Sequence, residues 1–155
     1  MKNLQEYISE TISKGNGSEM EKINDNDITN IRSSSTFNDV IDMRKLYNDI
    51  ETKYGKTPQT ESEAMVIQIT NTPLNKADYD AIKKLKDEEN PQKRNEVVDR
   101  IFKNVFSDYL IPNKKFNFYY NKSFHGYYMD LGISYIENIR GKQTPLSATI
   151  CAFNI

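Results

Sequence analysis

The sequence is poor in the residues that most often carry cross-links or chemistry. Its 155 residues include one cysteine, one histidine and no tryptophan. A single cysteine excludes an internal disulfide and a cysteine-based zinc site, and it fits a reducing compartment. A single histidine excludes chemistry that needs two imidazoles. We therefore expect no metal and no cofactor in this protein.

Long apolar runs and a strong net charge are missing as well. No stretch approaches the ~20 apolar residues of a membrane-spanning helix, and the first residues lack the apolar segment of a signal peptide. The formal net charge is −1, so no overall field attracts nucleic acid or a membrane surface. We expect a protein of the host cytoplasm, or of a virion assembled there, without a membrane partner.

The composition and length of the chain are sufficient for one folded domain. Hydrophobic residues make up 37% of the chain and charged residues 28%, which lies above the disordered regime. A chain of 155 residues can bury about 70% of its unfolded surface. The composition predicts an N-terminal arm, residues 1–35, followed by a body, residues 36–155.

Aromatic residues are densest in Lys115–Arg140, and their spacing predicts a β-hairpin. One apolar set shares a parity in the first strand: Phe116, Phe118 and Tyr120. Another set shares a parity in the second strand: Tyr127, Met129, Leu131, Ile133 and Tyr135. Between the strands lie Asn121 and Gly126, two residues that tolerate turn dihedrals.

A third strand is predicted at Leu146–Phe153. Its even-numbered face holds Leu146, Ala148 and Ile150, and its odd-numbered face holds Ser147, Thr149, Cys151 and Phe153. Short turns join antiparallel neighbours, so the three strands are expected to form a meander. A sheet this small needs an apolar cover on one face. The fold class expected is therefore α+β, with three or four helices packed on a small antiparallel sheet.

Helical spacing recurs three times in the body. The first helix is predicted over residues 36–54, because Thr36 and Asp39 match a capping box. The second is predicted over about residues 76–89 and the third over about residues 91–110. The third helix has a broad apolar face, so it is the element expected to lie across the sheet.

The segment Ala64–Thr70 is short and rich in β-branched residues, which predicts a strand. Thr60 and Glu63 also match a capping box, so a helical turn is the alternative. The two interpretations differ in whether this segment joins the sheet.

The first residues predict an amphipathic helix over residues 2–14. Its apolar stripe has helical spacing and consists of Leu4, Tyr7, Ile8 and Ile12. Residues 15–35 are mostly polar and predict a linker, with Ile23, Ile28 and Ile31 as anchoring contacts. A helix this short needs a surface to dock on, which is either a partner or the protein's own core.

His125 and Cys151 are the two side chains that could carry chemistry. His125 could act as a general acid or base near neutral pH, but the residues around it match no catalytic motif, and a surface role in the turn is favoured. Cys151 lies between apolar residues of a predicted strand, which is typical of a buried, inert thiol.

Basic side chains flank the aromatic stretch and make nucleic acid an alternative partner. The set comprises Lys114, Lys115, Lys122, Arg140 and Lys142. Basic side chains beside exposed tyrosines can combine phosphate contact with base stacking. The slightly acidic chain as a whole, and the need for half of these aromatic residues in the core, weigh against this partner.

The opening MKNLQEYISETI, Met1–Ile12, is similar to a short leader that recurs in proteins encoded by tailed phages of gut bacteria. The composition, rich in asparagine, lysine, isoleucine and tyrosine, also resembles that of phage or mobile-element proteins of low-GC bacteria. The resemblance implies a phage or mobile-element origin, with the leader helix docking on a virion component. It implies no active site.

Together these features favour a non-enzymatic binding or assembly protein, associated with a virion, whose partner is another protein or a second copy of the chain. The partner-binding residues expected are Leu4, Tyr7, Ile8, Ile12, Tyr119, Tyr128 and His125. Tyrosine suits an interface because it buries a large area and keeps a polar tip. Two alternatives stay open: an inhibitor of a host defence protein, similar to an anti-CRISPR protein, or a nucleic-acid-associated regulator; and a small enzyme that uses His125.

Overall fold

The structure is a computed structural model, and it describes residues 19–30, 37–122 and 129–154. Its helices are α2 (Met43–Tyr54), α3 (Glu61–Asn71), α4 (Lys76–Lys83) and α5 (Pro91–Val105). An antiparallel sheet has the strand order β2 (Ile28–Asn30), β6 (Lys142–Phe153), β5 (Met129–Ile139) and β4 (Phe116–Lys122). A second, two-stranded sheet pairs β1 (Met20–Glu21) with β3 (Leu74–Asn75). The prediction of an α+β fold with a C-terminal meander is confirmed.

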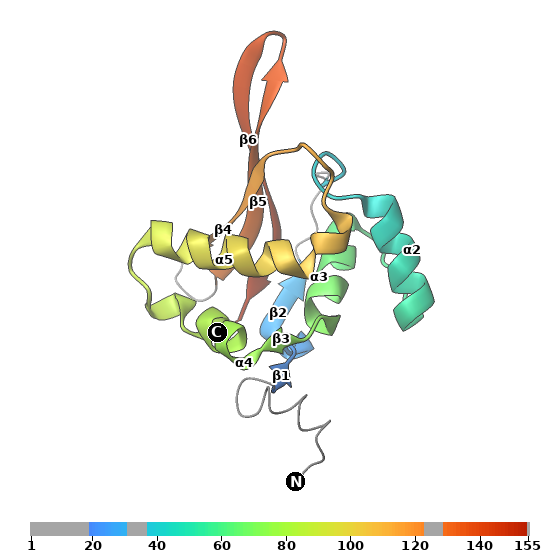
Figure 1. Ribbon diagram of the computed structural model, residues 1–155, viewed down its shortest axis with the longest axis vertical. Helices are drawn as coiled ribbons and strands as arrows, with labels where there is room; N and C mark the ends of the chain where they lie inside the picture. Colours follow the sequence, from blue (N-terminus) through green and yellow to red (C-terminus); the bar gives the residue numbers. More distant parts are fainter. Residues whose placement is uncertain (1–18, 31–36, 123–128, 155) are drawn as a thin grey trace, which may run out of the picture.

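Helix α5 lies across one face of the larger sheet, with α2 and α3 beside it (Figure 1). Phe102 of α5 and Phe106, which caps its C-terminus, pack on Phe118 of β4, with ring centroids 5.9 and 5.8 Å apart. The ring of Phe153 in β6 lies 6.2 Å from that of Phe102. The third predicted helix is therefore the cover of the sheet, as expected. None of the helices in the described ranges is long and apolar enough to span a membrane.

The segment Ala64–Thr70 is helical, so the strand prediction was wrong and its alternative was right. It lies in α3, where the Thr60 hydroxyl accepts a hydrogen bond from the Glu63 N–H at 3.0 Å. The Glu63 carboxylate in turn accepts from the Gln59 N–H at 2.6 Å. These bonds satisfy amides that a helix start leaves unpaired, and they outweigh the β-propensity of the branched residues.

The first body helix begins at Met43 and not at residue 36. Asp42 provides the cap by accepting from the Lys45 N–H at 3.1 Å, and Thr36 lies outside the described residues. Residues 37–41 instead form a turn and one isolated bridge. The Phe37 N–H donates to the Glu61 carboxylate of α3 at 2.6 Å, a partner far along the chain that the local pattern could not reveal.

Two other helices are shorter than predicted. The helix α4 ends at Lys83 and is followed by a 3₁₀ turn, Leu85–Asp87, where one helix to about residue 89 was expected. Likewise α5 ends at Val105, and residues 107–109 form a further 3₁₀ turn. The apolar periodicity continues through both turns because Leu85 and Tyr109 are still buried, which explains the overestimate.

Part of the predicted linker belongs to the sheet. Within residues 19–30, β2 pairs with the end of β6, in the register Ile28 opposite Phe153. Two of the three expected anchors, Ile23 and Ile28, are buried in the core. The helix predicted over residues 2–14 and the third anchor, Ile31, lie outside the described residues.

Strand β6 changes the parity of its buried side chains. Ala148 and Ile150 are buried at even positions, as one predicted face requires, but Cys151 and Phe153 are then buried at odd positions, with Ala152 between them also covered. A bulge in β6 accounts for the change: Leu131 and Gly132 of β5 pair with Cys151 and Thr149, which leaves Ile150 as the extra residue. Such a bulge adds one residue to one strand, which turns the later side chains to the opposite face.

Candidate functional site

The most prominent feature of the molecule is a two-stranded projection. Strand β4 begins at Phe116, which pairs with Tyr135, while β5 and β6 continue as a pair to their turn. We call residues 136–145 the projecting hairpin. Figure 1 shows it rising out of the body at the end opposite β1. The overhang follows from strand length, since β5 has 11 residues and β4 has 7.

The projecting hairpin ends in a tight two-residue turn. Arg140 and Gly141 have φ angles of 55° and 78°, and Ile139 pairs with Lys142 on either side. Two consecutive positive φ angles are typical of a type I′ turn, whose twist matches that of the flanking strands. The hairpin therefore continues the twist of the sheet without a loose loop at its tip.

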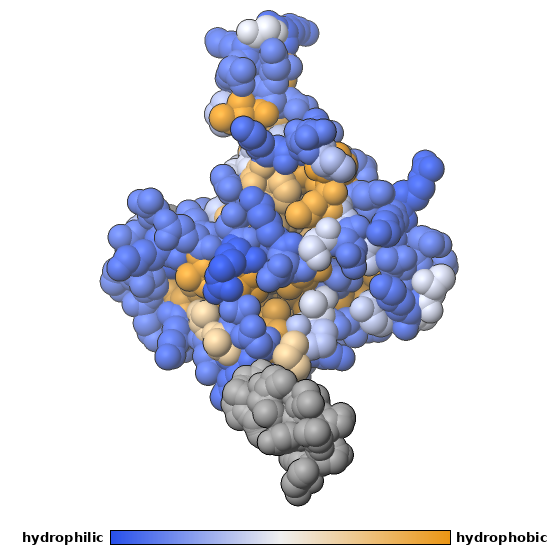
Figure 2. Space-filling view, viewed as in Figure 1, coloured by the Kyte–Doolittle hydropathy of each residue, from blue (hydrophilic) through white to orange (hydrophobic). Residues whose placement is uncertain are grey.

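The projecting hairpin carries exposed apolar side chains. Ile136 is 64% exposed and Ile139 is 42% exposed, and their opposite parity places them on opposite faces. Within the described ranges Met20 is the third large apolar residue that is exposed, at 56%. Figure 2 shows the projection as mostly hydrophilic, with an apolar spot on it and more apolar surface where it meets the body.

A hollow of about 870 Å³ lies at the base of the projecting hairpin. Its lining comes from α5, from the segment before β4, and from β4, β5 and β6. Ser134, Tyr135, Ile136 and Glu137 are consecutive, yet all four line it. Because successive strand residues point to opposite faces, a hollow that touches four in a row borders the edge of the strand. We call this hollow the edge groove.

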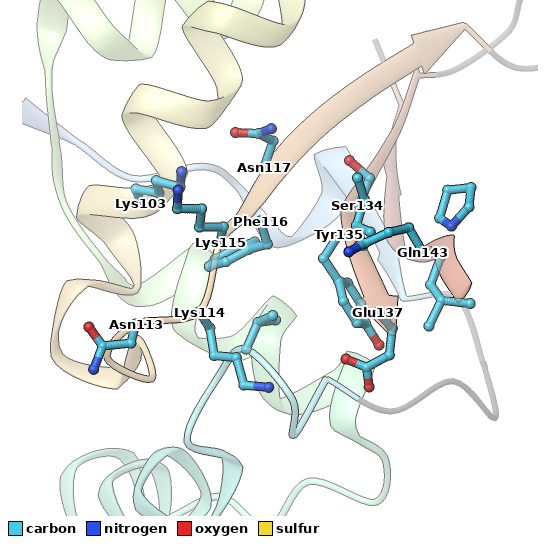
Figure 3. Close-up of a pocket in the computed structure, with 14 residues that line it drawn as sticks. Lys103, Asn113, Lys114, Lys115, Phe116, Asn117, Ser134, Tyr135, Glu137 and Gln143 are labelled. Carbon is cyan, nitrogen blue, oxygen red and sulfur yellow. The ribbon is translucent and has the colours of Figure 1, made fainter. Parts of the chain in front are cut away.

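The edge groove is mainly basic. Lys103, Lys114 and Lys115 line it together with a single acidic residue, Glu137. In Figure 3 the three lysines and Asn113 lie on one side of the space, and Tyr135, Glu137 and Gln143 lie on the other. Two of the lysines, Lys114 and Lys115, are exposed and form no ion pair with any described residue.

Lys103 is held in place by its neighbours. Its Nζ lies 3.2 Å from the Asp99 carboxylate, one helical turn away, and 5.2 Å from the centre of the Phe116 ring. The ring and the carboxylate keep this ammonium group at the wall of the groove. The remaining positive charge of the groove therefore comes from Lys114 and Lys115, which are free to meet a ligand.

Tyr135 is a structural part of the wall. Its hydroxyl donates to the Asp39 carboxylate at 3.0 Å, which ties the base of the projecting hairpin to the segment before α2. Burial, followed by the hydrogen bond to Asp39, raises the pKa of Tyr135 to about 12. The phenol therefore stays protonated at neutral pH and acts as a hydrogen-bond donor and not as a base.

Helix α5 covers the free edge of β4. The Phe118 N–H donates to the Asp99 carboxylate at 2.9 Å, and the Tyr120 N–H donates to the Asn95 side-chain oxygen at 2.8 Å. These amides consequently point away from β5. Two α5 side chains thus satisfy edge groups that would otherwise be open to another strand.

The same alternation shows which groups of β5 border the edge groove. The backbone N–H and C=O groups of even-numbered β4 residues point away from β5. Those of odd-numbered residues, such as Asn117, therefore point toward β5, where Asn117 pairs with Ser134. Even-numbered residues of β5 therefore face the β4 side. Beyond the start of β4, Ile136 and Asn138 direct their N–H and C=O groups to an edge that no described strand occupies.

The opposite edge of the hairpin is protected by a proline. Pro145 pairs with Ile136, at a position where backbone groups point away from the neighbouring strand. Proline has no N–H, so it cannot donate to a further strand on that side. The β6 edge is thereby blunted, while the β5 edge at 136–138 contains no proline.

The predicted site residues are only partly brought together. Lys114 and Lys115 line the edge groove at its inner end, whereas Arg140 and Lys142 lie at the tip of the projecting hairpin, five residues or about 16 Å along the strand from Tyr135 at ~3.3 Å per residue. Half-buried Tyr119 lies over Gly132. The others lie outside the described residues, for Lys122 only its side chain: Leu4, Tyr7, Ile8, Ile12, Lys122, His125 and Tyr128.

Cys151 is buried, as the sequence suggested, and burial raises the pKa of its thiol. The sequence did not single out Lys103, Ile136, Glu137 or Ile139. The signal that could have found the overhang is Gly141: a turn there requires the strand before it to continue to about residue 139, beyond the point where β4 begins. No family model matches the chain, and comparisons with curated proteins and with solved structures find no match.

Proposed function

We propose that this chain is a non-enzymatic binding protein of a phage or mobile element, and that it docks on a virion component through the projecting hairpin. The observation that carries the proposal is the exposure of Ile136 and Ile139 on a two-stranded projection. A projection gives a partner access to both faces and one edge. The origin in a phage rests on the resemblance of the first twelve residues to a phage leader.

The energetics favour an interface at this place. A lone hairpin is marginally stable in water, and this one is ordered because it continues the sheet of the body. Complete burial of an isoleucine side chain contributes ~1.5–3 kcal/mol, and Ile136 and Ile139 are 64% and 42% exposed, so each forgoes roughly half of that free energy. A partner that covers both residues regains that free energy without having to order the hairpin first.

The ionisable groups also favour binding over catalysis. The edge groove holds lysines, a glutamate and a tyrosine that remains protonated at neutral pH. The thiol of Cys151 is in the core. None of these is a nucleophile paired with a base, which is the arrangement that covalent catalysis uses.

The proposal is tested by replacing Ile136 and Ile139 with threonine and following the protein in its native source. Threonine keeps a branched side chain suited to a strand, so the hairpin should persist. Wild-type protein is expected in purified particles at a fixed stoichiometry, and the double variant is expected in the soluble fraction. The measurement is quantitative mass spectrometry of particles after sedimentation.

Met20→Thr is the matched control, because Met20 is similarly exposed but lies on β1, away from the hairpin. It should remain with the particles. The proposal is wrong if the double variant stays particle-bound at the wild-type ratio. Recovery of the wild-type chain with a host defence protein, and not with particles, would replace assembly by the inhibitor alternative.

A further inference from the structure

We infer that the edge groove takes an extended, acidic polypeptide segment, which adds as a strand to β5 beside Ile136 and Asn138. This inference rests on the proposed function and names the chemistry of the partner. It combines two independent observations: a strand edge with which no described strand pairs, and a cluster of lysines on the wall that faces it.

The strand edge determines where an added strand would form its hydrogen bonds. At Phe118 and Tyr120 the fold satisfies the outer amides of β4 with side chains of α5. Where β4 has not yet begun, no described strand pairs with the equivalent groups of β5, and these groups border the groove. An added strand would continue the line of β4 and pair with four β5 residues, 136–139, over about 13 Å.

Charge decides what kind of strand fits. Lys114 and Lys115 are exposed at the wall that an added strand would approach, and Lys103 lies behind them. Acidic side chains on the incoming segment would meet these ammonium groups at short range. Glu137 is the opposing charge, so it should weaken the binding of an acidic segment, and its removal should strengthen it.

Other occupants fit less well. A second copy of the same edge would bring its own lysines against these, which disfavours pairing of two β5 edges. Single-stranded nucleic acid would meet the lysines but could not complete a β-ladder. It also needs exposed rings for stacking, whereas Phe116 is 6% exposed and the Tyr135 hydroxyl is bound to Asp39.

The first experiment uses the full chain and a short fluorescent peptide in which aspartate alternates with valine. Binding is followed by fluorescence anisotropy. The same peptide with lysine in place of aspartate should bind at least about tenfold more weakly, because like charges meet. Two further versions carry N-methyl groups on alternate peptide bonds, in the two opposite phases. One phase should abolish binding and the other should leave it unchanged, since alternate amides face the edge.

The second experiment changes the protein. Lys114→Glu combined with Lys115→Glu should weaken binding of the acidic peptide about tenfold, and Glu137→Gln should strengthen it about threefold. Lys84→Glu combined with Lys86→Glu is the matched control. It reverses two exposed charges that do not line the groove and that follow α4, at the end of the molecule away from the projecting hairpin (Figure 1), so it should change affinity less than about threefold.

Three results would overturn the inference. Equal binding of both N-methylated versions would show attraction without strand addition. Tighter binding of an oligothymidylate that displaces the peptide would assign the groove to nucleic acid. Self-association abolished by the Lys114→Glu and Lys115→Glu changes would assign it to a second copy. If the acidic peptide does not bind, while the variant with threonine at positions 136 and 139 still dissociates from the particles, the inference is wrong and the proposed function is retained.

Discussion

Truncation of Phe102 to alanine is expected to lower the free energy of unfolding by about 3–5 kcal/mol. Phe102 is fully buried in the last turn of α5, and its ring packs against those of Phe118 and Phe153, which belong to two different strands. Its removal leaves a cavity between helix and sheet that neighbours on regular elements cannot collapse to fill. The free energy of unfolding of a whole domain of this size is about 5–15 kcal/mol, so the variant should be close to the limit at which the protein still folds.

The measurement is urea unfolding monitored by circular dichroism. Ile136→Ala is the matched control, because it removes an aliphatic side chain that is 64% exposed, and it should cost less than about 0.5 kcal/mol. A loss below about 1.5 kcal/mol for Phe102→Ala would mean that α5 does not cover the sheet as described.

Replacement of Gly132 by alanine is expected to destabilise the protein by about 1–3 kcal/mol or more, although only one methyl group is added. A Cβ built on Gly132 would lie 2.6 Å from the Ala148 carbonyl oxygen, and it would also meet the ring of Tyr119. The phenol end of Tyr119, its Cζ and hydroxyl oxygen, lies over the glycine on the face of the sheet away from α5. The carbonyl belongs to the backbone of β6 and cannot move without shifting the strand.

A second variant separates the two contacts. Tyr119→Ala added to Gly132→Ala should recover part of the loss, because the ring is removed while the clash with the Ala148 carbonyl remains. Gly55→Asn is the control, since no atom lies within 4 Å of a Cβ there and asparagine tolerates its φ of 64°. It should cost roughly 1 kcal/mol or less. Equal stability of Gly132→Ala and wild type by thermal unfolding would contradict the close approach.

Much of the fold could be predicted because its signals are local. The parity of Phe116, Phe118 and Tyr120 identified the buried face of β4, and the apolar face of residues 91–110 identified the cover. A two-residue period and a broad apolar stripe survive in almost any tertiary context. The helix caps at Asn75 and Asn90 are equally local, because each oxygen accepts from an amide two or three residues ahead.

The errors came from contacts between distant residues. Glu61 accepts from the amide of Phe37, which removes that residue from any helix, and only the folded chain brings the two together. Strand β2 was missed because three residues in a polar stretch become a strand only when β6 is beside them. The parity of β6 changes at a bulge at Ile150, which the pairing with β5 reveals and the sequence of β6 alone does not.

The site was predictable in its charges but not in its geometry. Lys114 and Lys115 were selected for nucleic acid, together with basic residues that are now placed at the tip of the projecting hairpin. The open edge could not be seen, because it depends on where β4 begins relative to β5. That position is set by the pairing of Phe116 with Tyr135.

Amide hydrogen exchange measured by NMR tests the central claim most directly, because it reports on the β5 edge itself. In the free protein the amides of Ile136 and Asn138 should exchange quickly, while those of Glu137 and Ile139, which face β6, should exchange slowly. Addition of the acidic peptide should slow exchange at Ile136 and Asn138 and leave the other two unchanged. Protection of all four in the free chain, or unchanged exchange at Ile136 and Asn138 in the saturated complex, would contradict the account.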